Sequence, residues 1–191
     1  MKLVCLGDSI TYGYRVRRKE SWVSLLSERS GISVVNKGIV GDTTSGMLSR
    51  LERDVLREKP THVMIMGGSN DFVCEMPISI VKSNIFSMVY QSYHYGILPL
   101  LGIPIPMIAE EAKKFFQFSD DFEKINSNIE EYRNWLINFS SLSQCKYLDL
   151  YSIFIDSKTK NLKRDLYIDG IHPTKEGNLK ISDYIMSVLK L

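Results

Sequence analysis

The sequence has few of the residues that build disulfide frameworks and metal sites: three cysteines and three histidines among 191 residues. Cys5, Cys74 and Cys145 are odd in number, lie far apart and form no CxxC pair, which favours reduced thiols over disulfides. Histidine is the side chain that most readily changes charge near neutral pH. Three histidines therefore leave few candidates for acid–base chemistry.

Long apolar runs and a strong excess of one charge are also missing. The stretch from Met1 to Leu6 turns at Gly7, which leaves an apolar run too short for a signal peptide. No segment approaches the roughly 20 apolar residues of a membrane-spanning helix. We therefore expect a cytoplasmic location without stable membrane insertion. The net charge of +2 gives no field that would recruit nucleic acid, so no nucleic-acid partner is expected.

The composition that remains is that of an ordinary globular domain. Hydrophobic residues make up 44% of the chain and charged residues 24%, and its length suffices for one packed core with some loop material to spare. We find no internal repeat, low-complexity tract or linker. The sequence predicts a single domain over residues 1–191, and its pattern favours no particular oligomeric state.

Short apolar runs alternate with longer segments of helical period. The apolar runs predict strands at residues 2–6, 33–36, 62–66, 97–103 and 146–150. Apolar residues at spacings of three and four predict helices around residues 22–31, 47–55, 81–89, 122–139 and 181–189. Strict alternation is typical of βαβ units. We expect the α/β class, as a three-layer α/β/α sandwich with a flavodoxin-like, five-stranded parallel sheet in the order 2-1-3-4-5.

The segment 103–121 departs from this alternation. It carries Pro104 and Pro106 and then a stretch that mixes charged residues with Phe115, Phe116 and Phe118. A connection of this length between a strand and a helix is usually functional. Two interpretations stay open: a substrate-selecting lid, or a surface excursion with a short helix.

Small polar loops follow the first three predicted strands, and a fourth precedes the last predicted helix. They are Gly7 to Thr11, Asn36 to Asp42, Gly67 to Asp71 and Asp169 to Pro173. Ligands of open parallel sheets bind beyond the carboxyl ends of the strands. The sequence therefore predicts a site at this rim.

The fourth loop carries a pair suited to proton transfer. A serine hydroxyl is a weak nucleophile until a base removes its proton, and a histidine does this best when a carboxylate orients it. Asp169 lies three residues before His172, whereas His62 and His94 have no carboxylate nearby in the sequence and are interpreted as structural. Taken alone, His172 before a proline could also simply open a helix.

The other loops supply candidate partners. Ser9 either presents its hydroxyl to the rim or caps a helix. The backbone N–H groups of Ser9 and Gly41 and the side-chain amide of Asn70 are the kind of donors that an oxyanion hole needs. Each of these residues also has an ordinary explanation in a turn or loop.

Taken together, the loops resemble the four sequence blocks of the SGNH, or GDSL-type, hydrolases, in that family's order and over nearly the whole chain. The matching residues are Gly7-Asp8-Ser9-Ile10-Thr11, Gly41 within Asn36 to Asp42, Gly68-x-Asn70-Asp71 and Asp169-x-x-His172-Pro173. The resemblance implies that Ser9 is the nucleophile and that His172 is the base and then the acid, oriented by Asp169. Gly41 and Asn70 would complete the oxyanion hole. It also implies an acyl-enzyme mechanism on a small-molecule ester, with no metal and no organic cofactor.

The substrate is less defined. Phe72, Ile105 and Met107 either line the crevice or pack in the core. The family covers lysophospholipases, thioesterases, aryl esterases and carbohydrate O-acetyl esterases. A small or medium-chain ester, a lysophospholipid, a thioester and an O-acetylated sugar all remain candidates. Cys74, just past the Asn70 loop, either packs inertly or lies near the site.

Three alternatives stay open. The run Gly67 to Asp71 nearly matches the G-x-S-x-G elbow of another hydrolase fold, which would make Ser69 the nucleophile. The loop Gly7 to Thr11 could instead cradle an anion in a flavodoxin-like binding module without enzymatic activity, although its glycines fit no phosphate loop. A hard cation could collect carboxylates at the rim, although their spacing matches no known ligand pattern. These carboxylates are Asp8, Asp42, Asp71 and Asp169, and His172 could approach the same rim.

Overall fold

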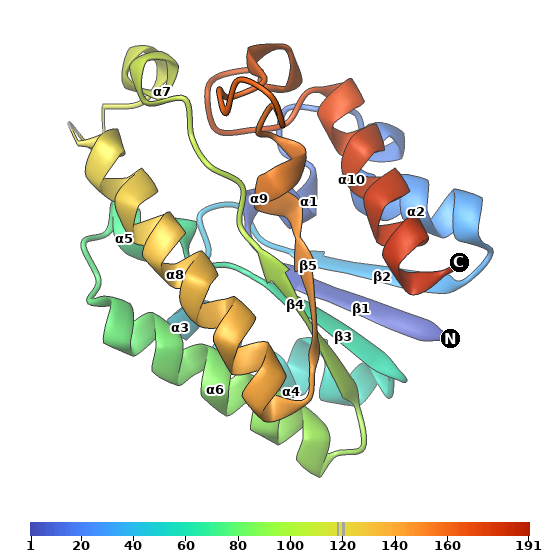
Figure 1. The fold of residues 1–191 in the computed structure, drawn as a ribbon. Coiled ribbons are helices and arrows are strands. Elements are labelled where there is room, and N and C mark those ends of the chain that lie inside the picture. Colours follow the sequence, from blue (N-terminus) through green and yellow to red (C-terminus); the bar gives the residue numbers. More distant parts are fainter. Residues whose placement is uncertain (118, 120) are drawn as a thin grey trace.

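A computed structural model, which describes residues 1–117, 119 and 121–191, shows a five-stranded parallel sheet in the order β2-β1-β3-β4-β5 (Figure 1). The strands are β1 (Lys2–Gly7), β2 (Ser33–Gly38), β3 (His62–Met66), β4 (Leu98–Ile103) and β5 (Lys146–Asp149). The predicted fold class and strand order are confirmed, and each predicted strand lies within two residues of the observed one.

Helices cover both faces of the sheet. On one face lie α2 (Trp22–Ser30) and α10 (Lys175–Leu189), and on the other lie α3 (Thr44–Ser49), α6 (Ile78–His94) and α8 (Phe122–Ser143) (Figure 1). Side chains of a strand point alternately to its two faces. Accordingly, Leu3 and Cys5 of β1 pack in one hydrophobic cluster, and Val4 and Leu6 pack in the other.

The predicted helix around residues 47–55 is interrupted. The structure has α3, then α4 (Leu51–Asp54) and a 3-10 turn, η2 (Leu56–Glu58). The break falls at Arg50, which is buried and directs its guanidinium to Asp42 and to the backbone of β1 and β2. Because these partners lie in other elements, the apolar period of the segment gives no sign of the break.

Short helices border the rim. They are α1 (Ser9–Tyr12), α5 (Ser69–Val73) and α9 (Leu150–Ile153), and two further 3-10 turns are η1 (Arg18–Glu20) and η3 (Arg164–Leu166). Elements of three to five residues are too short to show a hydrophobic period. The hydrophobic pattern therefore predicts loops in these segments.

The segment 103–121 begins as part of the core. Residues 104–108 are buried, and they lead into the short helix α7 (Ala109–Phe115). The Ile108 N–H donates to Gly170 O over 2.7 Å, and the Tyr167 hydroxyl donates to Pro106 O over 2.7 Å. Phe118 lies outside the described residues. A mobile lid within 103–121 stays a prediction, and these bonds anchor the first half of the segment.

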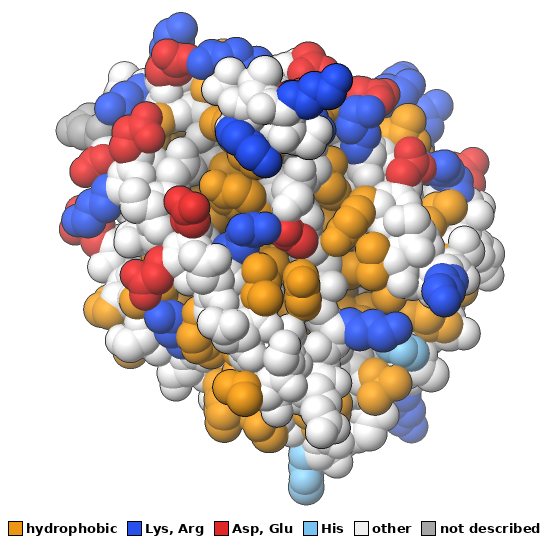
Figure 2. Space-filling view, viewed as in Figure 1, with side chains coloured by type: hydrophobic (Ala, Val, Ile, Leu, Met, Phe, Trp, Pro, Cys, Tyr) orange, Lys and Arg blue, Asp and Glu red, His pale blue; other side chains and the backbone are white. Residues whose placement is uncertain are grey.

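The face of the molecule in Figure 2 carries charges of both signs. On the face shown in Figure 2, Lys and Arg side chains are interspersed with Asp and Glu. No helix in the described part of the chain combines the length and the hydrophobicity needed to cross a bilayer. Each cysteine is a free thiol: Cys5 and Cys145 are buried, and Cys74 is exposed.

Candidate active site

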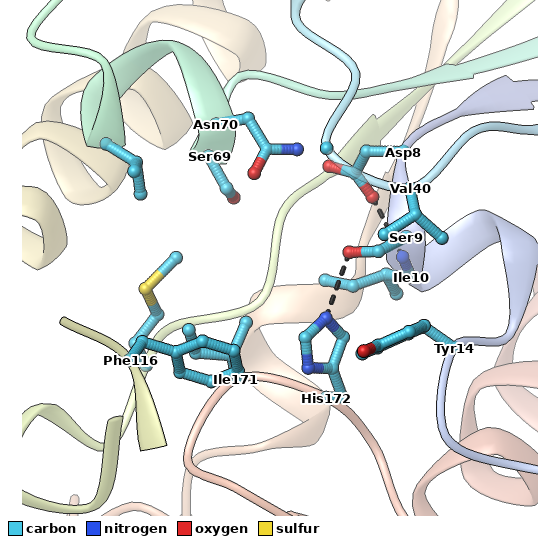
Figure 3. A pocket seen from close by; sticks show the side chains of 13 residues that line it. Asp8, Ser9, Ile10, Tyr14, Val40, Ser69, Asn70, Phe116, Ile171 and His172 are labelled. Atoms are coloured by element: carbon cyan, nitrogen blue, oxygen red, sulfur yellow. Dashed lines mark hydrogen bonds between the residues drawn. The ribbon is translucent and has the colours of Figure 1, made fainter. Parts of the chain in front are cut away.

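The four polar loops meet at the carboxyl ends of the strands, as the sequence predicts. In the observed order, β1 lies between β2 and β3, so the chain leaves β1 at the point where the connections diverge to the two sides. Such switch points form crevices in open α/β sheets. Figure 3 shows Ser9 and His172 on one side of the resulting cavity and Ser69 and Asn70 on another.

Asp8 directs the chain from β1 into α1. Its carboxylate accepts a hydrogen bond from the Ile10 N–H at 2.9 Å and so caps the helix that Ser9 begins. Asp8 is almost completely buried, and this burial raises its pKa to about 6, although the Ile10 N–H and the nearby His172 oppose the rise. Ser9 is therefore held at the first turn of a capped helix, beside a carboxyl group that titrates near neutrality.

Ser9, His172 and Asp169 form a continuous chain of hydrogen bonds. The Ser9 Oγ lies 3.0 Å from His172 Nε2, and His172 Nδ1 lies 2.9 Å from Asp169 Oδ2 (Figure 3 for the Ser9–His172 bond). A carboxylate only accepts hydrogen bonds, so Asp169 places the imidazole proton on Nδ1 and leaves Nε2 to accept from the serine hydroxyl. All three side chains are buried.

Asp169 is fixed by its own loop. Its Oδ1 accepts the backbone N–H groups of Ile171 and His172 at 3.0 and 2.8 Å. Burial alone would raise the pKa of Asp169, but the hydrogen bonds and charge of His172, together with the Ile171 N–H, lower it overall. Asp169 is therefore ionised at neutral pH, as a group that stabilises an imidazolium must be.

Gly41 and Asn70 lie next to each other at the rim. Gly41 adopts φ +77°, a left-handed conformation that other residues rarely take, and its missing side chain leaves the backbone open to the cavity. The Asn70 Nδ2 donates to Asp42 O at 2.8 Å, which ties the β3 loop to the β2 loop. Because the amide carries two hydrogens, one donor remains for a ligand.

Two buried charged residues hold these loops. The Arg50 guanidinium binds the Asp42 carboxylate at 2.7 Å and the carbonyl oxygens of Lys37 and Gly7 at 2.8 and 3.0 Å. The fully buried Asp71 accepts the N–H and hydroxyl of Thr44 at the start of α3. Burial raises the pKa of Asp71, and the hydrogen bonds from Thr44 oppose the rise.

A cavity of about 160 Å³ opens beside Ser9. It is lined by Asp8, Ser9, Ile10, Tyr14, Val40, Gly41, Ser69, Asn70, Val73, Met107, Phe116, Ile171 and His172. Met107 thus faces the predicted crevice. Phe72 and Ile105 lie in the core, where Phe72 packs edge-on against Tyr132 at 5.8 Å and Ile105 joins the cluster under α10. Within the described residues, Cys74 is not part of the lining.

Ser69 also lines the cavity, but its surroundings differ from those of Ser9. Its hydroxyl is buried and has no hydrogen-bond partner among the described residues. If Ser69 were the nucleophile of a G-x-S-x-G elbow, a base would have to lie within hydrogen-bond distance of this hydroxyl. The base at this rim, His172, is bonded to Ser9 instead.

The rim carboxylates have separate partners. Asp42 binds Arg50, Asp71 binds Thr44, and Asp169 binds His172. No cluster of three or more His, Cys, Asp or Glu residues suited to a metal ion occurs in the described part of the chain. This donor set favours proton transfer over metal binding.

No sequence pattern points to Tyr14 or Arg15 as neighbours of His172, and Phe116 is predicted only as part of the segment 103–121. The Tyr14 ring meets the imidazole edge-on at 4.8 Å between centroids, and the Phe116 ring lies at 6.0 Å. Arg15 forms an ion pair with Asp169, with Nε 2.9 Å from Oδ2. In the sequence these residues are far from the loop Asp169 to Pro173, which we call the triad loop. No local pattern therefore singles them out.

Comparisons with known proteins place this chain in a family. Residues 5–180 match the model of the GDSL-like lipase/acylhydrolase family. An arylesterase of Vibrio mimicus is 26% identical over 98% of this chain and 88% of its own length. A lipolytic protein assigned to the G-D-S-L family, from Desulfitobacterium hafniense, has a solved structure with a TM-score of 0.85 and 29% identity, covering 98% of both chains.

The chain therefore belongs to the GDSL-like lipase/acylhydrolase family, and its class of reaction is the hydrolysis of an ester. A further relative, esterase TesA of Pseudomonas aeruginosa, is 36% identical over 54% of this chain and 55% of its own length. The match to TesA thus spans about half of each protein.

Proposed function

We propose that the chain cleaves carboxylic esters with Ser9 as the nucleophile, His172 as the general base and acid, and Asp169 as the residue that orients His172. The observation that carries the proposal is the continuous chain of bonds from Ser9 Oγ through the imidazole to Asp169. Nucleophile, base and orienting carboxylate at hydrogen-bond distance are the arrangement that activates a serine.

The reaction proceeds in two steps. Ser9 Oγ attacks the ester carbonyl carbon as its proton passes to His172 Nε2. The carbon–oxygen bond to the alcohol then breaks, and His172 returns the proton to the departing alkoxide. A water molecule repeats the attack on the acyl-enzyme with His172 as base, which releases the carboxylic acid and restores Ser9.

The negative charge on the carbonyl oxygen needs donors that are already in place. The backbone N–H groups of Ser9 and Gly41 and the free hydrogen of the Asn70 amide are the proposed donors. Each such donor contributes about 2.7 to 4 kcal/mol of transition-state stabilisation. Their positions at the ends of three adjacent strands support this assignment.

A serine-directed fluorophosphonate probe tests the nucleophile directly. Labelling of the wild-type protein, Ser9→Ala and Ser69→Ala is followed by intact mass and peptide mapping. We expect the wild type and Ser69→Ala to gain one probe on Ser9, and Ser9→Ala to gain none. Labelling of Ser69, or retained labelling in Ser9→Ala, would contradict the proposal. An unlabelled wild type that binds flavin or nucleotide would favour the binding-module alternative.

The size of the cavity supports a short acyl group. Its volume of about 160 Å³ is smaller than the about 300 to 1,000 Å³ of sites for drug-sized ligands. Across p-nitrophenyl esters from acetyl to decanoyl, we expect kcat/KM to be highest at four carbons or fewer. A maximum at eight carbons or more would mean that the cavity does not hold the acyl chain.

Several finer assignments remain proposals. Among relatives, one is named an arylesterase and another an acetylxylan esterase, and both names fit a small ester. A thioester and a lysophospholipid stay candidates. The cytoplasmic location and the lack of a nucleic-acid partner also stay predictions.

A further inference from the structure

We propose that Arg15 is a positioning residue that sets the charge balance of the Ser9–His172–Asp169 chain and ties it to the aromatic end of α7. The inference rests on the function proposed above. Arg15 has no role in the four sequence blocks, and it approaches the site from the loop that follows α1. Three observations at this residue, two on its side chain and one on its backbone, carry the inference.

The first observation is that Arg15 and His172 share one oxygen of Asp169. Arg15 Nε and His172 Nδ1 each lie 2.9 Å from Asp169 Oδ2, so the two nitrogens are less than about 6 Å apart. Asp169 is fully buried, whereas 35% of the Arg15 side chain is exposed. The guanidinium therefore lies between the Asp169 carboxylate and solvent. The guanidinium and the imidazole both interact with the negative charge of this carboxylate.

The second observation is the backbone at Arg15. Its φ of +66° lies in the left-handed region, which residues with a Cβ rarely adopt. Such conformations persist where the surrounding structure requires them. Here the conformation turns the chain after Tyr14 so that the Tyr14 ring and the Arg15 guanidinium both reach the His172–Asp169 pair.

The third observation is the contact with α7. The Arg15 guanidinium carbon lies 5.7 Å from the Phe115 ring centre and 5.8 Å from that of Phe116. Guanidinium planes stack on aromatic faces, which an ammonium cannot do in the same way. Phe116 also lines the cavity and lies 6.0 Å from the His172 ring (Figure 3). One side chain thus contacts both the triad carboxylate and a wall of the cavity.

These contacts predict two separable effects. The groups around His172 are Asp169 and Asp8 as carboxylates, Tyr14 as a ring edge, and Arg15 through Asp169. Arg15 contributes the positive charge in this set, and it lies on the Asp169 oxygen that His172 also binds. Loss of this charge therefore favours the imidazolium, which cannot accept the Ser9 proton. Loss of the contact between the guanidinium and the rings instead loosens Phe116, which lines the cavity.

Two substitutions separate the effects. Arg15→Met removes the charge but keeps a flexible apolar stem against the rings, and Arg15→Lys keeps the charge but loses the planar stack. Arg164→Met is the matched control, because Arg164 is another arginine that contacts α7. It does so through ion pairs with Glu110 and Glu111 and does not contact Asp169. Kinetics with p-nitrophenyl acetate and butyrate are measured from pH 5 to 9, with unfolding curves to verify folding.

For Arg15→Met, we expect the midpoint of the acidic limb of kcat/KM to rise by about half to one pH unit, with little change in KM. For Arg15→Lys, we expect a midpoint close to that of the wild type and a KM for the butyrate raised by about two- to fivefold. Arg164→Met is expected to retain the wild-type midpoint. A purely structural role of Arg15 would lower activity equally at every pH.

Wild-type pH profiles and KM values in both Arg15 variants would overturn the inference. So would a shift of the midpoint in Arg164→Met equal to that in Arg15→Met, because the effect would then belong to α7 as a whole. Fluorophosphonate labelling of Ser9 in the same variants is independent of this result. If Ser9 is labelled and the profiles are unchanged, the inference about Arg15 fails while the proposed function stands.

Discussion

At the scale of single residues, what distinguishes the two serines in the cavity is their partners. Ser9 and Ser69 both follow a strand, begin a short helix and are buried. The Ser9 hydroxyl has an imidazole at 3.0 Å, and the Ser69 hydroxyl has no partner among the described residues. The proposed difference in reactivity therefore follows from the histidine that the tertiary structure places beside Ser9, since the hydroxyl groups are chemically the same.

Asp8 yields a prediction about pH and stability. Burial raises its folded pKa to about 6, whereas an unfolded Asp titrates near 3.9. Well below pH 4 the carboxyl is protonated in both states. As the pH rises from about 4 to 6, the unfolded state ionises first, so the free energy of unfolding falls by up to about 3 kcal/mol. Asp8→Asn retains the oxygen that caps α1 and lacks this ionisation.

We therefore expect Asp8→Asn to gain stability over the wild type between pH 4 and pH 7, measured by urea unfolding at several pH values. The control is Asp156→Asn, because backbone hydrogen bonds from Thr159 and Lys158 lower the pKa of Asp156. This second substitution should lose stability at pH 7, and the loss should become smaller as the pH falls. A pH-independent difference for Asp8→Asn would contradict the assigned burial effect.

At the scale of elements, α7 is attached to the triad loop by backbone contact. Gly170, next to Asp169, adopts φ +82° and accepts a hydrogen bond from the Ile108 N–H. A Cβ at Gly170 would lie 2.7 Å from both Ile108 O and Ala112 N. Glycine is thus needed for the conformation and also for the close approach of the two segments. Because of this contact, we expect a substitution at Gly170 to lower the activity of the enzyme.

Gly170→Ala and Gly31→Ala separate these two requirements. Gly31 also has a positive φ, +70°, but no atom lies within 4 Å of its added Cβ. We expect Gly31→Ala to lose about 1 kcal/mol of unfolding free energy and to keep full activity. Gly170→Ala should lose about 2 to 4 kcal/mol and lower kcat/KM for p-nitrophenyl acetate. Equal losses of stability with full activity in both would refute a tight contact between α7 and the triad loop.

At the scale of the whole molecule, the rim is held together by buried groups that connect different strands. Arg50 joins the carbonyl groups of β1 and β2 to Asp42 in the β2 loop, and Asn70 joins the β3 loop to the same residue. Removal of one partner from a buried ion pair leaves an uncompensated charge, which is strongly unfavourable. The donors proposed for the oxyanion are therefore preorganised by the network as well as by their strands.

Most of the architecture could be predicted from the sequence, because its signals are local. Strands rich in apolar residues and helices with a clear period, such as α8, repeat along the chain. The break at Arg50 and the placement of Ile105 could not be predicted. The break at Arg50 depends on hydrogen bonds from its guanidinium to residues of other elements. Ile105 belongs to an apolar stretch, and the sequence does not show which of its side chains face the cavity and which face the core.

The sequence by itself determined the α/β fold, the strand order and the four loops that carry Ser9, Gly41, Asn70, Asp169 and His172. Local periodicity and ordered motifs suffice for these features. Only the tertiary structure decided that Arg15 shares Asp169 with His172 and that α7 packs on Gly170. These contacts join segments more than 50 residues apart, and their formation depends on the relative positions of packed elements, which no local pattern encodes.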